Sequence, residues 1–136
     1  MIGLDTNVLV RYLVGDHPQQ SRAARQLVEE RCTEDSPAHI DKVVLAEIVW
    51  VLEGAYGYDR ELVVEVLEHM LRAAELEFDD VEVTWRAFRA YRDQGVDLAD
   101  ALIVYANLEA GCEETFTFDR AMGRLGGAQV LDQTSQ

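Results

Sequence analysis

Hydrophobic positions along the chain follow two periods, and their alternation predicts a parallel α/β fold. Short apolar runs have the length of buried strands, at residues 2–4, 38–40, 76–78, 115–118 and 130–131. Between them, apolar residues recur three or four positions apart, which is the period of an amphipathic helix. Such alternation is typical of a parallel sheet covered by helices. We therefore expect a three-layer α/β fold in which helices flank a central parallel β-sheet of four to five short strands.

Capping residues and breakers divide the helical segments. Thr6 or Asn7 can cap a first helix, which residues 15–18 end. Asp59 and Asp97 are expected to cap two later helices. After the first helix, we expect helices over residues 19–30, 42–56, 60–74, 79–94 and 98–110. Two inward faces are expected from the spacing: Ala23, Ala24, Leu27 and Val28 in one helix, and Leu62, Val63, Val66, Leu67 and Met70 in another.

The composition is that of one globular domain. The 136 residues are 49% hydrophobic and 28% charged, and a chain of this length can bury a core without a disulfide or a zinc ion. The longest apolar run, residues 101–106, is far shorter than the ~20 residues of a membrane span. Asp5 stands where a secretory signal would need apolar residues. We expect a single domain over residues 1–136, soluble and cytoplasmic.

The charge is strongly negative. Twelve Lys and Arg residues oppose 26 Asp and Glu residues, for a net charge of −14. This balance argues against nonspecific binding to nucleic acid, because such binding needs basic residues that neutralise phosphates. Lys42 is the only lysine. An acid-rich, lysine-poor composition leads to the hypothesis that the protein is adapted to a salty cytoplasm, although acidity also serves ordinary solubility.

Glu47 lies on a helix face that is otherwise apolar. Its neighbours one turn before and after it are Val43, Val44, Trp50 and Val51. We expect this stripe to face the core, where an unpaired carboxylate costs several kcal/mol unless a cation or a donor meets it. The alternative is a helix that is buried on most sides, with Glu47 turned toward solvent.

Asp100 repeats this pattern inside the first turn of the helix at 98–110, with Asp97 one turn earlier. N-capping accounts for Asp97 alone. The helix dipole favours a charge at Asp100 by only about 0.3–1 kcal/mol. Two acids at this spacing repel each other unless positive charge lies between them. Asp100 is therefore a candidate functional acid.

Asp5 and Asp119 each follow a strand-like run directly and precede a helix start, so both should lie at the carboxyl edge of the sheet. N-capping is the alternative for each. If they meet Glu47 and Asp100 there, like charges about 4 Å apart repel by roughly 4 kcal/mol at an effective dielectric of 20. Clustered carboxylates without a paired His or Cys favour Mg²⁺ or Mn²⁺ over zinc.

Four short motifs around these acids resemble those of the PIN domain family. They are Leu4-Asp5-Thr6-Asn7-Val8-Leu9, Leu45-Ala46-Glu47-Ile48, Asp97-Leu98-Ala99-Asp100-Ala101-Leu102-Ile103 and Thr115-Phe116-Thr117-Phe118-Asp119. Each motif alone is weak, but the four in this order, over residues 2–130, are specific. The short length is most similar to that of VapC-type toxins of bacterial and archaeal toxin–antitoxin pairs.

The resemblance implies an Mg²⁺- or Mn²⁺-dependent endoribonuclease that leaves 5′-phosphate and 3′-hydroxyl ends. It implies a catalytic and metal-binding quartet of Asp5, Glu47, Asp100 and Asp119, with Asp97 as an auxiliary acid. Side chains beside the quartet could bind a carboxylate, a water or a phosphate, namely Thr6, Asn7 and Thr117. Three arginines are candidates for phosphate contacts, or else ordinary solvated side chains, namely Arg11, Arg120 and Arg124.

The implied partners are an RNA substrate, a small antitoxin that blocks the acidic site, and a second copy in a homodimer. Other functions stay open: a non-catalytic PIN-like binding module, or an RNA-processing nuclease outside a toxin system. A phosphatase of the HAD type also begins with a strand-end acid, but it needs a second Asp where Asn7 stands. A receiver domain needs a late lysine, and Lys42 is too early.

Overall fold

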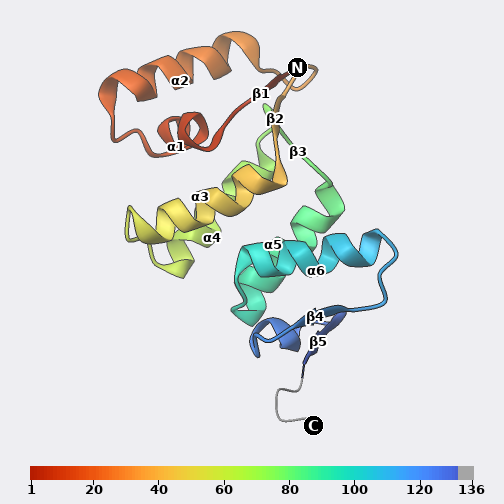
Figure 1. The fold of residues 1–136 in the computed structure, drawn as a ribbon. Coiled ribbons are helices and arrows are strands. Elements are labelled where there is room, and N and C mark those ends of the chain that lie inside the picture. The colour runs from red at the N-terminus through yellow and green to blue at the C-terminus, as the bar shows by residue number, and fades with distance from the viewer. Residues whose placement is uncertain (132–136) are drawn as a thin grey trace. The chain divides into compact units, whose positions relative to one another are not determined.

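The computed structural model describes residues 1–131, and the predicted α/β class is confirmed (Figure 1). The chain forms two compact units that meet in sequence between Val81 and Glu82. Within residues 1–131 there are five short strands, and each pairs in parallel with its neighbour. They form a three-stranded sheet in the first unit and a two-stranded sheet in the second. No helix in this part of the chain is long and apolar enough to cross a membrane.

The first unit contains a three-stranded sheet with the order β1-β2-β3. In the register, Ile2 lies opposite Ala38, which lies opposite Leu76. Each crossover between these parallel strands is a pair of helices. The strands are β1 (Ile2–Gly3), β2 (Ala38–Ile40) and β3 (Leu76–Phe78), and the helices are α1 (Thr6–Val14), α2 (Pro18–Arg31), α3 (Lys42–Gly54) and α4 (Arg60–Arg72).

The second unit contains two helices followed by a two-stranded parallel sheet. Thr115 lies opposite Ala128 in the register, and one turn of 3-10 helix, η1 (Met122–Arg124), connects the two strands. The strand expected at residues 130–131 is therefore centred slightly earlier. The elements are α5 (Val81–Gln94), α6 (Leu98–Glu109), β4 (Thr115–Thr117) and β5 (Ala128–Val130).

Aspartates cap four of the helices, namely α1, α3, α4 and α6, and the cap of α1 differs from the expectation. Asp59 and Asp97 cap α4 and α6 as predicted, because their side chains accept bonds from Leu62 N and Asp100 N. The cap of α1 is Asp5 rather than Thr6 or Asn7, so the alternative role expected for Asp5 is confirmed. Asp5 is extended, with φ −86° and ψ 175°, and Val8 N donates to its carboxylate. Thr6 is already the first helical residue and cannot serve as its cap.

The core of the first unit uses a different face of α3 from the one expected. Its buried side chains are Leu45, Ile48, Val49 and Leu52. Val43 and Trp50 are 65% and 54% exposed, and Glu47 is exposed between them. The prediction that this stripe faces the core is wrong, since the apolar residues of α3 cover most of its circumference and the 45/48/49/52 face is the one that packs.

The inward faces of α2 and α4 are confirmed only in part. In α4, Val63, Leu67 and Met70 are buried, whereas Leu62 is exposed. In α2, Ala24 and Val28 are buried together with Ser21; Ala23 is exposed and Leu27 is half-buried. The packed stripe of each helix is thus narrower than the apolar stripe in its sequence.

Candidate functional site

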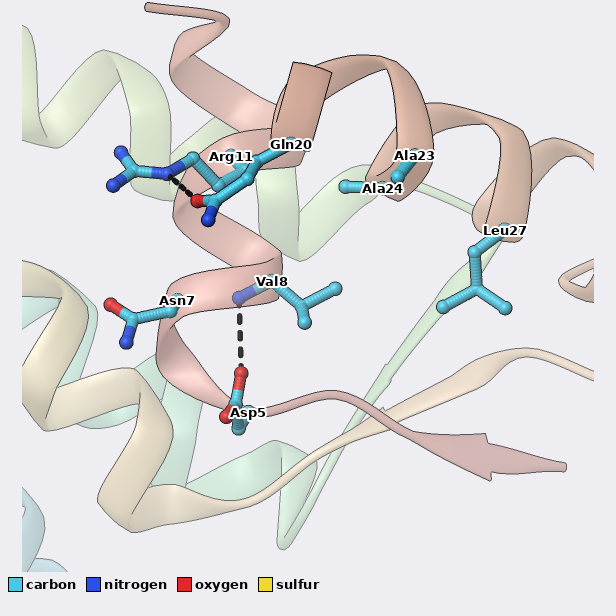
Figure 2. Close-up of a pocket in the computed structure, with 8 residues that line it drawn as sticks. All are labelled: Asp5, Asn7, Val8, Arg11, Gln20, Ala23, Ala24 and Leu27. Atoms are coloured by element: carbon cyan, nitrogen blue, oxygen red, sulfur yellow. Dashed lines mark hydrogen bonds between the residues drawn. The ribbon is translucent and has the colours of Figure 1, made fainter. Parts of the chain in front are cut away.

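Asp5 stands directly after β1, at the carboxyl end of the strand and the N-terminus of α1. Its Oδ1 accepts a hydrogen bond of 3.0 Å from Val8 N (Figure 2). Asp5 is exposed, and its Oδ2 has no hydrogen-bond donor among residues 1–131. One oxygen is therefore used to start the helix, while the other is available to a ligand at this edge of the sheet.

Glu47 is held by a side chain from another helix. Thr6 Oγ1, in the first turn of α1, donates a 2.8 Å hydrogen bond to Glu47 Oε1 in the middle of α3. Thr6 is half-buried and Glu47 is exposed. Thr6 thus connects two of the candidate acids in the first unit. Asp5 precedes it directly in the chain, and Glu47 accepts its hydrogen bond.

Asp100 is the acid of the second unit that has the least favourable surroundings. It is half-buried in the first turn of α6, and its carboxylate accepts no hydrogen bond from the described residues. Burial, together with the negative charges of Asp97 and Asp119, raises the pKa of Asp100 above its ordinary value. A carboxylate with acidic neighbours and no donor is a carboxylate that a cation would stabilise.

Asp119 and Asp97 each accept a hydrogen bond from the backbone, and their negative charges act on Asp100. Asp119 Oδ1 accepts from Met122 N at 3.1 Å, and Asp97 Oδ1 accepts from Asp100 N at 3.3 Å. Thr117 Oγ1 accepts a 3.0 Å bond from Asp119 N. Thr117 therefore fixes the backbone at Asp119, and each acid keeps its second oxygen without a donor in the described part of the chain.

The chemistry of these donors fits a hard divalent cation. The candidate acids of the first unit and those of the second offer carboxylate oxygens, with threonine hydroxyls beside them. Mg²⁺ and Mn²⁺ prefer such oxygen ligands. Within each unit, over residues 1–131, no three His, Cys, Asp or Glu side chains already form a group that could hold a metal ion. The residues that could hold one are Asp5 and Glu47 in the first unit, and Asp97, Asp100 and Asp119 in the second.

Two of the histidines have local contacts that the structure describes. His17 caps α2, since its Nδ1 accepts from Gln20 N at 3.2 Å. His39 on β2 lies 3.2 Å from the Glu77 carboxylate on the neighbouring strand. The first contact starts a helix, and the second connects neighbouring strands.

The three candidate arginines differ in how far they are already occupied. Arg11 donates from Nε to Gln20 Oε1 at 2.8 Å, and from one terminal nitrogen to Tyr56 at 2.8 Å and to Asp16 at 3.3 Å. Arg120 is exposed, and so is Arg124, whose Nε reaches Ala121 O at 3.5 Å. Arg120 and Arg124 are the freer donors of the three.

A cavity of about 310 Å³ lies between α1 and α2, and sequence reasoning missed it. It adjoins Asp5 and uses residues of α2 that were expected in the core, namely Ala23, Ala24 and Leu27 (Figure 2). The available signal was Gln20, which continues the same stripe one turn earlier with a polar side chain. A stripe that ends in an amide is better suited to lining a pocket than to closing a core. The full lining is Asp5, Asn7, Val8, Arg11, Gln20, Ala23, Ala24 and Leu27.

Comparison with known proteins identifies two similarities. The sequence model of the PIN domain matches residues 2–128, which includes all four acidic motifs. The VapC ribonuclease of Aquifex aeolicus (strain VF5) is 26% identical over 123 residues, covering 90% of this chain and 90% of that protein. The similarity therefore extends through both units rather than being confined to one motif.

Proposed function

Because this chain belongs to the PIN domain family, we propose that it is a metal-dependent endoribonuclease, the toxin of a toxin–antitoxin pair. The observation that carries the proposal is Asp100, whose half-buried carboxylate has Asp97 and Asp119 for neighbours and no donor in the described residues. Such an arrangement is unfavourable in isolation and becomes favourable with a bound cation. The name of the Aquifex relative, a ribonuclease, supports RNA as the substrate.

The metal-binding acids are Asp5, Glu47, Asp100 and Asp119. Asp5 combines this role with the N-cap of α1, and Asp119 with a hydrogen bond from Met122 N, so one oxygen of each is fixed by the backbone. Thr6 orients the Glu47 carboxylate. The auxiliary acid Asp97 keeps α6 in place and adds negative charge beside Asp100.

The reaction is hydrolysis of an RNA phosphodiester. Water attacks phosphorus, the bond from phosphorus to the 3′ oxygen breaks, and the products carry a 5′-phosphate and a 3′-hydroxyl. Mg²⁺ or Mn²⁺, when bound, supplies a water of lowered pKa and positive charge close to the phosphate. The chain itself supplies the oxygen ligands and the hydroxyl and amide groups around them, Thr6, Asn7 and Thr117, which position the acids and the substrate.

RNA binding to a chain of charge −14 needs local positive charge. Arg120 and Arg124 follow Asp119 closely in sequence and are exposed, so they are the phosphate contacts we favour. Arg11 contributes from a fixed position, since Tyr56 and Asp16 hold its guanidinium. A cation held by these acids would offset the remaining repulsion between them and the RNA backbone.

The proposed protein partners are a small basic antitoxin and a second copy of this chain. The large negative charge would speed the approach of an antitoxin segment that carries arginine. Light scattering of the purified chain, alone and with a candidate antitoxin at low salt, tests both assemblies. A monomeric chain that forms no complex would contradict this part of the proposal and leave the nuclease itself untouched.

The decisive experiment is cleavage of total RNA with Mn²⁺ by wild type, Asp5→Asn and Asp100→Asn. We expect each substitution to reduce cleavage at least about a hundredfold, because each removes a charged ligand of the reaction site. Mapping the new ends tests the 5′-phosphate products. Equal cleavage by all three proteins would refute the catalytic role of these acids, and a saturable Mn²⁺ titration lost in Asp100→Asn separates an enzyme from a non-catalytic PIN-like module.

A further inference from the structure

The cavity between α1 and α2 has a polar end and an apolar side. Its volume, about 310 Å³, is at the lower limit of ligand pockets, which range over roughly 300–1,000 Å³. Figure 2 shows Gln20 beside Arg11 at one end of the α2 stripe, with Ala23, Ala24 and Leu27 along the following turns. All of these residues belong to the first unit.

The polar end is held in place by a hydrogen-bond network. Gln20 Oε1 accepts from Arg11 Nε at 2.8 Å, and the same guanidinium is fixed by Tyr56 and Asp16. The Gln20 oxygen is therefore occupied, and its amide hydrogens have no acceptor in the described residues. A planar guanidinium and an oriented amide donor thus border one end of the cavity.

The apolar side has room because two of its residues are alanines. Ala23 and Ala24 contribute only a methyl group each, while Val8 and Leu27 supply the larger walls. Flat apolar faces fit such a space, and polar edges fit the end with Gln20. The amide hydrogens of Gln20 can donate to an acceptor on the edge of a nucleobase.

We propose that this cavity receives one nucleobase of the RNA substrate and gives the enzyme a base preference at a fixed distance from the cleaved bond. Proteins recognise single-stranded RNA by taking unstacked bases onto guanidinium or apolar surfaces and bonding their edges. Asp5 lines the same cavity, which places the base beside one of the proposed metal ligands. The inference rests on the proposed function, since it assigns a substrate subsite to that site.

Two substitutions test the cavity, and a third serves as a matched control. Ala23→Phe fills the space from an exposed position of α2, and Gln20→Ala removes the amide at its polar end. Gln19→Phe adds the same aromatic ring to the same helix at an exposed position outside the lining. Sequencing the ends produced from a randomised RNA gives the base enrichment at each position around the cut.

We expect wild type and Gln19→Phe to enrich the same base at one fixed position. In Ala23→Phe and Gln20→Ala this enrichment should fall by about tenfold, the size expected for losing one side chain–base contact. An unchanged profile in both variants, or a wild type without base preference, would overturn the inference. If both variants keep the base preference of wild type, a protein segment, such as one from an antitoxin, becomes the better candidate ligand for the cavity.

A second readout separates this inference from the proposed function. Short single-stranded homopolymers of each of the four nucleotides are titrated into metal-free protein that carries Asp100→Asn. We expect this protein to bind one homopolymer preferentially, and the additional Ala23→Phe substitution to remove that preference. Preferential binding without any cleavage by wild type would refute the nuclease and support the base pocket. RNA cleavage with the same base enrichment in wild type and Ala23→Phe would support the nuclease activity and refute the base pocket.

Discussion

The hydroxyl of Thr6 donates a 2.8 Å hydrogen bond to the carboxylate of Glu47, 41 residues further along the chain. Thr6 is the first residue of α1 and follows Asp5 directly, whereas Glu47 lies on an exposed face of α3. No burial holds the Glu47 side chain in one rotamer. The bond therefore selects one orientation of a long, otherwise mobile carboxylate and directs it toward the start of α1.

Removal of the Thr6 hydroxyl should reduce activity without unfolding the protein. Thr6→Val keeps the shape of the side chain and releases Glu47. We expect Mn²⁺-dependent RNA cleavage to fall about 10–100-fold, the usual effect of losing a partner that orients a metal ligand. Cleavage rates and thermal unfolding of the same samples provide the measurement.

Thr6→Ser is the matched control, because it keeps the hydroxyl and removes only a methyl group. It should retain most of the wild-type rate. If Thr6→Val cleaves RNA as fast as wild type, the hydrogen bond does not position Glu47 for catalysis.

Asp100 should destabilise the metal-free protein at neutral pH. Its pKa is raised in the folded state by burial and by Asp97 and Asp119, so the folded state binds this proton more tightly than the unfolded state. Stability from this group is then lost as pH rises through the folded pKa and is restored below the unfolded value of about 3.9. Asp100→Asn should raise the thermal midpoint at pH 7 in EDTA, with a smaller gain in acid. A lower midpoint for the variant at pH 7 would contradict the raised pKa.

The charge of Asp97 should be separable from its capping bond. Asn is as good an N-cap as Asp, so Asp97→Asn keeps the bond to Asp100 N and removes one negative neighbour. We expect the pKa of Asp100 to fall, because the second cause of its rise is gone. A carboxyl-carbon NMR titration of metal-free protein measures this directly. An unchanged pKa of Asp100 in a folded variant would assign the whole effect to burial and Asp119.

The sequence pattern identified the elements because local chemistry determines them. Residues 38–40 and 76–78 are strands within the expected bounds. Asp59 caps α4 and Asp97 caps α6, as the sequence predicted. A capping aspartate acts on the first turn of its own helix, so its effect can be read from a few residues. The α1 cap differed because Asp5, Thr6 and Asn7 are all capable caps in sequence, and only the backbone shows which one is extended.

Tertiary packing decided what the pattern could not. Almost every face of α3 is apolar, so periodicity could not show that Glu47 would be exposed with Val43 and Trp50. The spacing of Ala23 and Leu27 predicted that both would lie in the core, but in the structure they line a cavity. The cavity forms because α1 and α2 do not close completely around small side chains. The roles of Asp5, Glu47, Asp100 and Asp119 in binding one ion stay a prediction.

Tyr56 should stabilise the link between α1 and the end of α3. Its hydroxyl donates to Asp16 at 2.9 Å and accepts from Arg11 at 2.8 Å. Burial and the bond to Asp16 raise the pKa of Tyr56, so the phenol stays protonated as a donor. Tyr56→Phe should lower the free energy of unfolding by about 1–2 kcal/mol, because Arg11 and Asp16 each lose a partner. Urea unfolding measures the change; Tyr58→Phe, for which no hydroxyl bond is described, should be near neutral.

Salt should stabilise this protein more than a typical chain of its size. The net charge is −14, and even the only lysine is shared, since Lys42 Nζ lies 4.0 Å from Asp79 and 3.8 Å from Asp80. Repulsion among surface acids therefore dominates, and salt shortens its range from about 10 Å at 0.1 M to about 3 Å at 1 M. The thermal midpoint should rise steadily from low to molar KCl, and by more than in sucrose of equal osmolality, because sucrose stabilises only by exclusion from the protein surface and does not screen charge. A thermal midpoint that does not change with KCl would contradict the hypothesis of adaptation to a salty cytoplasm. Solubility and partner binding would then explain the acidity.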